Sequence, residues 1–245
     1  MRSGVVGVVG GGQLARMMAQ AAIPLDIGIV LLAADEHDGA AQVVPDVIVG
    51  SPDDPDHLAS LARRCDVVTF DHELVDPDLL AGLEAAGHAV RPSSSSMSLA
   101  QDKRRQRREL GEAGFPMPRW APIDALTDIQ AFAEAAGWPI VLKASSGGYD
   151  GRGVWTVADP DEARAVWEGA EAAGTMLLAE ERLDLDRELA VLVARTPSGD
   201  MAVYPVTETV QRGGICHELR VPCRLDPALI RDAEDAAREI AETIG

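Results

Sequence analysis

The chain has 245 residues, of which 47% are hydrophobic and 4% aromatic, so alanine, valine and leucine must supply most of its core. Its 40 acidic residues outnumber its 22 basic ones, and the formal net charge of −18 argues against nucleic acid or a membrane surface as a partner, because both are polyanionic. Three cysteines without a C-x-x-C pair, no charged-then-apolar leader and no apolar stretch near the ~20 residues of a membrane span predict a cytoplasmic protein with free thiols.

The first hundred residues alternate between short apolar runs and segments with helical spacing. Strands are predicted at Val5–Val9, Ile27–Ala33, Asp46–Val49, Asp66–Phe70 and Ala89–Val90. Helices are predicted at Gln13–Ala22, His57–Arg64 and Asp78–Ala86. Strands and helices that alternate through short links predict an α/β domain with a parallel sheet over residues 1–100.

A serine-rich loop and helix cap, Pro92–Ser96, marks the break after this domain. It precedes a charged helix at Ala100–Ala113, which the proline-rich segment Gly114–Pro118 ends because proline lacks the N–H that continues a helix. The remaining residues, 101–245, are predicted as a second domain.

The second domain begins with mixed helices and strands. A helix at Asp128–Ala136 ends at Gly137, and strands follow at Ile140–Lys143 and Val154–Val157. The next helix starts with a capping box formed by Asp159 and Glu162 and ends at Gly174. Further strands are predicted without helices between them, and one last helix closes the chain: Met176–Glu180, Glu188–Arg195, Met201–Val206, Ile215–Val221 and the helix from Asp226 to Ile244. This α+β region contains a hairpin turn at Pro197–Asp200.

A glycine motif, G-x-G-x-x-A, lies between the first strand and the first helix at Gly10–Ala15. Asp35 follows 20 residues after Ala15, as in a dinucleotide-binding fingerprint. Glycines let a backbone approach phosphate, and a helix N-terminus favours an anion. The motif therefore indicates either an anion site or a tight turn, and a nicotinamide cofactor is the weaker interpretation.

The segment KASSGGYDGRG, residues 143–153, joins two apolar strands. Lys143 ends a buried strand, and consecutive glycine N–H groups can surround phosphate oxygens, so the segment suits ATP although it is not a P-loop. Asp150 would repel phosphate and must serve another group, such as an amine, a metal or Arg152. The alternative is a solvated hairpin tip in which Asp150 and Arg152 pair with each other.

Two other charged segments are candidates for the same site. Glu180–Leu183 follows a buried strand and could border an adenine through its backbone, and Glu188 could accept from ribose hydroxyls. A basic cluster starts at Lys103 and continues through Arg108. The acids could equally be ordinary surface charge, and the cluster could be a solvated helix face from which Lys103 alone turns inward.

Together these residues resemble the ATP-grasp superfamily, and within it the N5-carboxyaminoimidazole ribonucleotide synthetase family. The resemblance covers the whole chain and rests on VVGGGQLARMM at 8–18, CDVVTFDHELV at 65–75, VRPSSSSMSLAQDK at 90–103, PIVLKASSGGYDGRG at 139–153 and EERL at 180–183. It implies a Rossmann-like preATP-grasp domain at 1–100 and an incomplete α+β ATP-grasp domain at 101–245, with a lid at about 118–178. It also implies ATP-dependent carboxylation of 5-aminoimidazole ribonucleotide with bicarbonate, through carboxyphosphate, in purine biosynthesis.

The resemblance assigns roles residue by residue. Tyr149, Asp150 and Arg152 would face the aminoimidazole and bicarbonate as catalytic residues. ATP would be bound by Lys103, Lys143, Gly148, Tyr149, Asp150, Gly151, Arg152, Gly153, Glu180, Glu181, Arg182, Leu183, Glu188 and Gln211. The ribonucleotide would be bound by Gln13, Leu14, Asp71 and Glu73, although DHELVD at 71–76 departs from the family's E-H-E-H-V-P at Asp71, Leu74 and Asp76.

The resemblance implies ATP and Mg²⁺ as cofactors and a homodimer for the complete protein. Family members continue past the last helix into strands that carry the acidic Mg²⁺ ligands, so the chain is expected to be a fragment that holds no metal ligand and does not turn over. The alternatives are a nucleotide-binding ATP-grasp module without turnover, a sister enzyme such as a formyl-transfer ligase or a biotin carboxylase, and an NAD oxidoreductase built on Gly10–Ala15.

Overall fold

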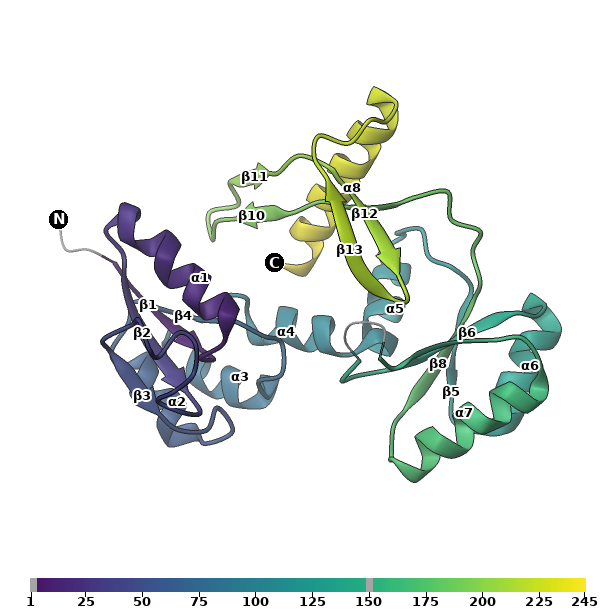
Figure 1. Cartoon of the computed structure of the whole chain (residues 1–245), viewed down its shortest axis with the longest axis horizontal. Helices are drawn as coiled ribbons and strands as arrows, with labels where there is room; N and C mark the ends of the chain where they lie inside the picture. The colour runs from purple at the N-terminus through teal and green to yellow at the C-terminus, as the bar shows by residue number, and fades with distance from the viewer. Residues whose placement is uncertain (1–3, 149–151) are drawn as a thin grey trace. The chain divides into compact units, whose positions relative to one another are not determined.

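The structure is a computed structural model, which describes residues 4–148 and 152–245. The chain divides into two compact units, Met1–Gln101 and Asp102–Gly245 (Figure 1). Each unit is described by itself below. No helix among the described residues is long and apolar enough to cross a membrane. All three cysteines are free.

A four-stranded parallel sheet forms the centre of the first unit. Its strands are β1 (Val5–Val9), β2 (Gly28–Ala33), β3 (Val47–Val49) and β4 (Val67–Phe70), in the order β3-β2-β1-β4. The parallel α/β sheet predicted from the sequence is confirmed. The predicted strand at Ala89–Val90 is reduced to a single bridge between Val90 and Val68.

Side chains alternate between the two faces of the sheet along each strand, and apolar side chains occur on both faces. Helices therefore cover both faces. Val8 and Leu31 pack with Ala15 of α1 (Gln13–Ala22), whereas Val9 and Leu32 pack in the cluster that holds α2 (Pro55–Ala62) and α3 (Pro77–Ala85). A short 3₁₀ helix, η1 (Ile23–Leu25), follows α1. The two helices α2 and α3 start one residue after aspartate caps, Asp54 and Asp76, each with proline in the first position.

The prediction of one continuous helix at Ala100–Ala113 is wrong. The structure has two helices, α4 (Ser94–Gln101) and α5 (Lys103–Glu112), separated at Asp102. Asp102 has an extended backbone, and its side chain caps α5 by accepting from the N–H groups of Arg104 and Arg105. The serine-rich segment predicted as a loop and helix cap contains the start of α4, and Ser93 accepts from the N–H of Ser96 in the way of a cap.

The second unit begins with a four-stranded sheet in the order β5-β8-β6-β7. The strands are β5 (Trp120–Ile123), β6 (Ile140–Ala144), β7 (Val154–Val157) and β8 (Leu177–Glu181), and neighbouring strands are antiparallel. Helices α6 (Leu126–Ala136) and α7 (Pro160–Ala172) lie side by side against one face (Figure 1). The strand β5 was not predicted, because its sequence WAPI contains a proline and shows no alternation.

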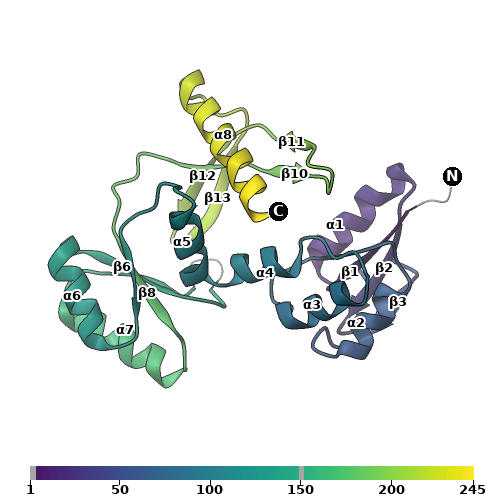
Figure 2. The ribbon, with the colours of Figure 1, turned by 180° about the vertical axis from the view of Figure 1, so that it is seen from behind.

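The rest of the second unit consists of two smaller sheets and a long helix. The pair β10 (Val193–Arg195) and β11 (Met201–Val203) contacts α8 (Pro227–Ile244), which runs beside them (Figure 2). The other sheet has the order β13-β12-β9, from β13 (Ile215–Arg220), β12 (Thr207–Arg212) and β9 (Glu188–Ala190). The single strand predicted at Glu188–Arg195 is wrong, because Leu189 pairs with Glu208 in one sheet and Val193 pairs with Val203 in the other.

Candidate functional site

The alternation of side chains along β6 separates a buried face from a polar one. Ile140 and Leu142 point into the core under α6 and α7. Lys143 lies on the opposite face, where the strand register sets Val141 against Glu180 of β8. Lys143 and Glu180 are therefore diagonal neighbours on the face that the two helices leave open.

Glu180 is a buried carboxylate held by two cations. Its side chain is 5% exposed, and Lys143 Nζ donates to Oε2 over 2.5 Å while Arg107 Nε of α5 donates to Oε1 over 2.6 Å. Burial acts to raise the pKa of Glu180, but Lys143 and Arg107 outweigh it and lower the pKa below its ordinary value. The interpretation of Glu180 as ordinary surface charge is wrong.

Lys103 and Lys143 are the two lysines of the whole chain, which has 20 arginines. Asp102 and Ser145 bring them to the same end of β6. Ser145 Oγ donates to Asp102 Oδ1 over 2.6 Å, and the N–H of Lys103 donates to the carbonyl of Ser145 over 2.8 Å. Burial acts to raise the pKa of Asp102, but hydrogen bonds from Ser145, Arg105 and Arg104 lower it overall.

The glycine-rich segment begins and ends beside these residues. A Cβ on Gly148 would lie 2.8 Å from the carbonyl oxygen of Arg152 and 3.7 Å from Lys103 Nζ. Gly153 has φ +75°, and a Cβ there would lie 3.0 Å from that of Ala144. Larger residues would close this turn, so its glycines keep backbone N–H groups near a lysine. Tyr149, Asp150 and Gly151 lie outside the described residues, as does the possible pairing of Asp150 with Arg152.

The basic cluster of α5 is not a solvated face. The guanidinium of Arg104 donates to the carbonyls of Leu177 and Ile123 and to Asp124, and Arg107 holds Glu180. Arg108 is the exposed member. Lys103 and Arg107 are four residues apart and therefore share a helix face. This spacing is a sequence signal that could have distinguished them from the exposed Arg108.

The other predicted nucleotide residues are distributed over two sheets. Glu181 is the last residue of β8 and accepts from the backbone and guanidinium of Arg119, while Arg182 and Leu183 follow it on the surface. Glu188 lies on β9 opposite Thr209, and Gln211 lies two residues further along β12, beyond a shift of register between Val210 and Gln211. Both side chains are exposed.

In the first unit, the glycine motif encloses a carboxylate of the protein itself. Gly10 has φ +115°, and a Cβ there would lie 1.6 Å from Asp71 Oδ1. The N–H of Gly12 donates to Asp71 Oδ2 over 2.9 Å. Asp71 Oδ1 is buried without a hydrogen-bond partner among the described residues, and His72 Nε2 lies 3.7 Å away. A carboxylate in this turn would repel a pyrophosphate, which argues against the nicotinamide cofactor.

The other residues predicted to bind the ribonucleotide lie at the start of α1 and in the loop after β4. Gln13 and Leu14 begin α1, and Leu14 is 56% exposed. Glu73 is exposed in the loop after β4. Asp35, the candidate ribose ligand of the dinucleotide fingerprint, accepts from the N–H of His37 in a local turn.

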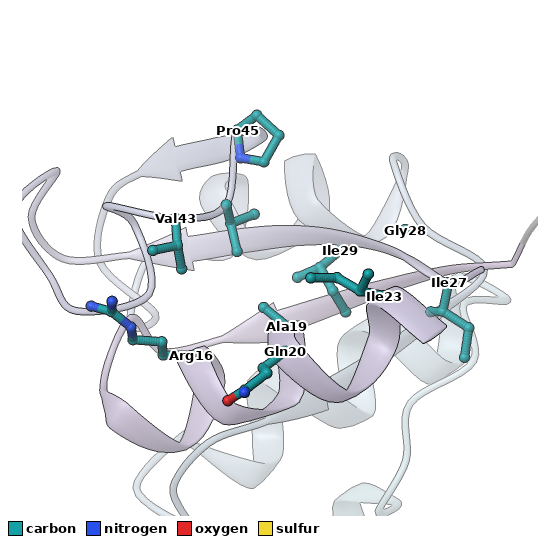
Figure 3. Close-up of a pocket in the computed structure, with 10 residues that line it drawn as sticks. Arg16, Ala19, Gln20, Ile23, Ile27, Gly28, Ile29, Val43 and Pro45 are labelled. Carbon is teal, nitrogen blue, oxygen red and sulfur yellow. The ribbon is translucent and has the colours of Figure 1, made fainter. Parts of the chain in front are cut away.

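A pocket of about 570 Å³ is lined by residues of α1, η1, β2 and the segment before β3 (Figure 3). Ile23, Ile29 and Val43 form apolar walls, and Arg16 and Gln20 are polar residues beside them. None of the predicted site residues lines this pocket.

The described residues contain no group of three or more His, Cys, Asp or Glu side chains that could hold a metal ion. The cationic side chains and the glycine turn suit the phosphates of a nucleotide.

Comparison with known proteins identifies relatives of both units. A family model of the ATP-grasp domain matches residues 108–245, and a model of the ribonucleotide synthetase preATP-grasp domain matches residues 3–101. The N5-carboxyaminoimidazole ribonucleotide synthase of Corynebacterium ammoniagenes is 43% identical over 98% of this chain and 59% of its own length. That of Mycobacterium leprae is 46% identical over 97% of this chain and 55% of its own length. The chain thus spans somewhat more than half the length of these relatives.

Solved structures agree with this similarity. A carboxyaminoimidazole ribonucleotide synthase from Aspergillus clavatus complexed with ATP has a TM-score of 0.91 and 32% identity, over 98% of this chain and 63% of that one. The synthase of that organism in complex with ADP and 5-aminoimidazole ribonucleotide has a TM-score of 0.89 and 30% identity over the same shares.

Proposed function

The chain belongs to the ATP-grasp family, and from this premise we propose that it serves the ATP-dependent carboxylation of 5-aminoimidazole ribonucleotide. In the proposed reaction, bicarbonate attacks the γ-phosphorus of ATP and releases ADP. The exocyclic amine then attacks the carbon of carboxyphosphate, so that phosphate leaves and N5-carboxyaminoimidazole ribonucleotide forms. The proposed small-molecule partners are ATP, bicarbonate and the aminoimidazole ribonucleotide.

The observation that carries the proposal is the approach of Lys103 to the glycine turn that follows Lys143 along the chain. Lys143 lies on β6 one residue before the end of that strand, and Lys103 Nζ lies 3.7 Å from where a Cβ on Gly148 would be. Two ammonium groups and a set of backbone N–H donors complement the charge of a triphosphate. An ammonium is a compact point charge suited to phosphate oxygens.

The proposed roles are those that the resemblance to the family implies for each residue. Lys103, Lys143 and the turn Gly148–Gly153 bind the phosphates and exclude water. The backbone of Glu180–Leu183 borders the adenine, and Glu188 and Gln211 bind the ribose side. Tyr149, Asp150 and Arg152 act at the reacting groups, and the ribonucleotide contacts Gln13, Leu14, Asp71 and Glu73.

Mg²⁺ bridges phosphate oxygens in phosphoryl transfer and is proposed as the metal of the nucleotide. The second candidate function is nucleotide binding without turnover, which Lys103 beside the glycine turn would support by itself. The cytoplasmic location and the homodimer stay predictions, which cell fractionation and light scattering would test.

One experiment separates these functions. ATP binding is measured by calorimetry, and phosphate release is measured with ATP, Mg²⁺, bicarbonate and aminoimidazole ribonucleotide. Release that requires both bicarbonate and ribonucleotide supports the carboxylation. Binding without such release supports the binding module, and binding of NAD instead of ATP contradicts both.

A further inference from the structure

The polar face of β6 and β8 carries two cations and one anion in direct contact. Glu180 is 5% exposed, Arg107 18% and Lys143 22%, so these charges interact with little screening by water. Their sum is +1. If Glu180 were paired with Lys143 alone, the sum would be zero and the lysine would carry no surplus charge toward a phosphate.

Each carboxylate oxygen of Glu180 is used by a different cation. Arg107 Nε takes Oε1 at 2.6 Å, and Lys143 Nζ takes Oε2 at 2.5 Å. The two cations come from different elements, α5 and β6. If the ion pair between Arg107 and Oε1 is weakened, Lys143 is left to balance more of the negative charge of Glu180, and the ion pair between Glu180 and Lys143 becomes stronger.

We propose that Arg107 is a positioning residue for the nucleotide, which acts through Glu180 on Lys143. Arg107 neutralises the buried carboxylate and orients it, and this leaves the charge of Lys143 available to a phosphate. The proposal rests on the proposed function, because it presumes that a nucleotide phosphate approaches Lys143.

A purely structural role for Arg107 is less consistent with its contacts. Arg104 already fastens α5 to the sheet by donating to the carbonyls of Leu177 and Ile123. Arg107 instead donates to the carboxylate that holds Lys143 and to the side chain of Gln106. Since Lys103 is four residues before it, one face of α5 supplies both a phosphate candidate and this neutralising group.

The first arm of the test measures ATP affinity by calorimetry for four proteins. Arg107→Met should bind ATP about tenfold more weakly than the wild type, a change of ~1.4 kcal/mol. Arg107→Met combined with Glu180→Gln restores the sum of +1 and should recover most of that loss. Arg108→Met removes the same charge from an exposed position of the same helix and should leave the affinity unchanged. Circular dichroism verifies that each variant is folded.

The second arm needs no nucleotide. Acetic anhydride acetylates neutral amines, and mass spectrometry can follow each of the two lysines in every variant. In Arg107→Met, Glu180 has lost its other cation and should bind the ammonium of Lys143 more firmly, so acetylation of Lys143 should slow about threefold or more. Adding Glu180→Gln should reverse this, and Lys103 is the internal reference.

The outcomes separate the two proposals. A wild type that binds no ATP contradicts the proposed function, while the acetylation rates still decide whether Arg107 governs Lys143. Equal ATP affinities for Arg107→Met and Arg108→Met, or a double variant as weak as Arg107→Met, would overturn the positioning role. Unchanged acetylation of Lys143 in Arg107→Met would overturn it as well.

Discussion

Glu180 receives hydrogen bonds from cations of two elements that are far apart in the chain, 37 residues away on β6 and 73 residues away on α5. The sequence predicted Lys143 and Glu180 as members of one site through the resemblance, but it could not show that they touch. Contact depends on the register of β6 against β8, which no local pattern encodes. Arg107 was missed for the same reason, because a run of basic residues conceals which members face inward.

Substitution of Lys143 by methionine should weaken ATP binding without loss of the fold. A charge-assisted hydrogen bond to phosphate contributes about 1.5–3 kcal/mol, so the dissociation constant should rise roughly tenfold to hundredfold. Calorimetry measures the affinity, and far-UV circular dichroism measures the fold. An unchanged dissociation constant in a folded variant would remove Lys143 from the phosphate site.

The depressed pKa of Glu180 predicts a dependence of stability on acid. An acid whose pKa is lower in the folded protein stabilises it above the unfolded value of about 4.5, and this contribution is lost as the pH falls through the folded pKa. Between pH 7 and pH 3, the free energy of unfolding should therefore fall more for the wild type than for Glu180→Gln. Urea unfolding at each pH measures this difference, and parallel curves would show that Glu180 is not linked to folding.

At the scale of elements, the capping role of Asp102 was the hardest feature to predict from the sequence. The run QDKRRQRREL has the composition of one uninterrupted helix, yet Asp102 ends α4 and caps α5. The capping position of Asp102 also depends on Ser145. Ser145 is fully buried, and its hydroxyl donates to Asp102 Oδ1, the oxygen that caps α5. By contrast, the alternation of strands and helices in the first unit could be predicted, because each strand there is a local apolar run between polar turns.

Substitution of Asp102 by alanine should destabilise the second unit by about 1.5–5 kcal/mol. The lost helix cap accounts for about 0.5–2 kcal/mol and the unsatisfied hydroxyl of Ser145 for about 1–3 kcal/mol. Asp159→Ala is the matched control, since Asp159 also caps a helix by accepting from two N–H groups, those of Asp161 and Glu162. Chemical denaturation measures both, and equal losses would mean that the bond to Ser145 contributes nothing.

At the scale of the whole molecule, each of the two units has its own hydrophobic core. The cores were predictable as far as strands and helices were, and so were the hairpin turn between β10 and β11 and the strand β13, but the strand β12 was not. The strands of the small sheets β10-β11 and β13-β12-β9 have three to six residues, and β12 reads TETVQR, in which no stretch is apolar enough to predict a strand. Pairing with β9 and β13, rather than its own composition, makes this segment a strand.

Separate cores predict separate responses to mutation. Ile140→Ala, in the centre of the second unit, should cost about 2–5 kcal/mol and lower amide protection mainly in residues 102–245. Leu80→Ala, in the first unit, should give the reverse pattern. Native-state hydrogen exchange measures both, and an equal loss of protection across the chain in either variant would show that the units unfold as one.

The close approach of Gly10 to Asp71 constrains how this protein can change over evolutionary time. A single substitution at position 10 meets the carboxylate of Asp71 at 1.6 Å and a backbone conformation that other residues avoid. Because the backbone conformation excludes other residues whatever stands at position 71, position 10 should stay glycine in descendants of this sequence while position 71 can vary.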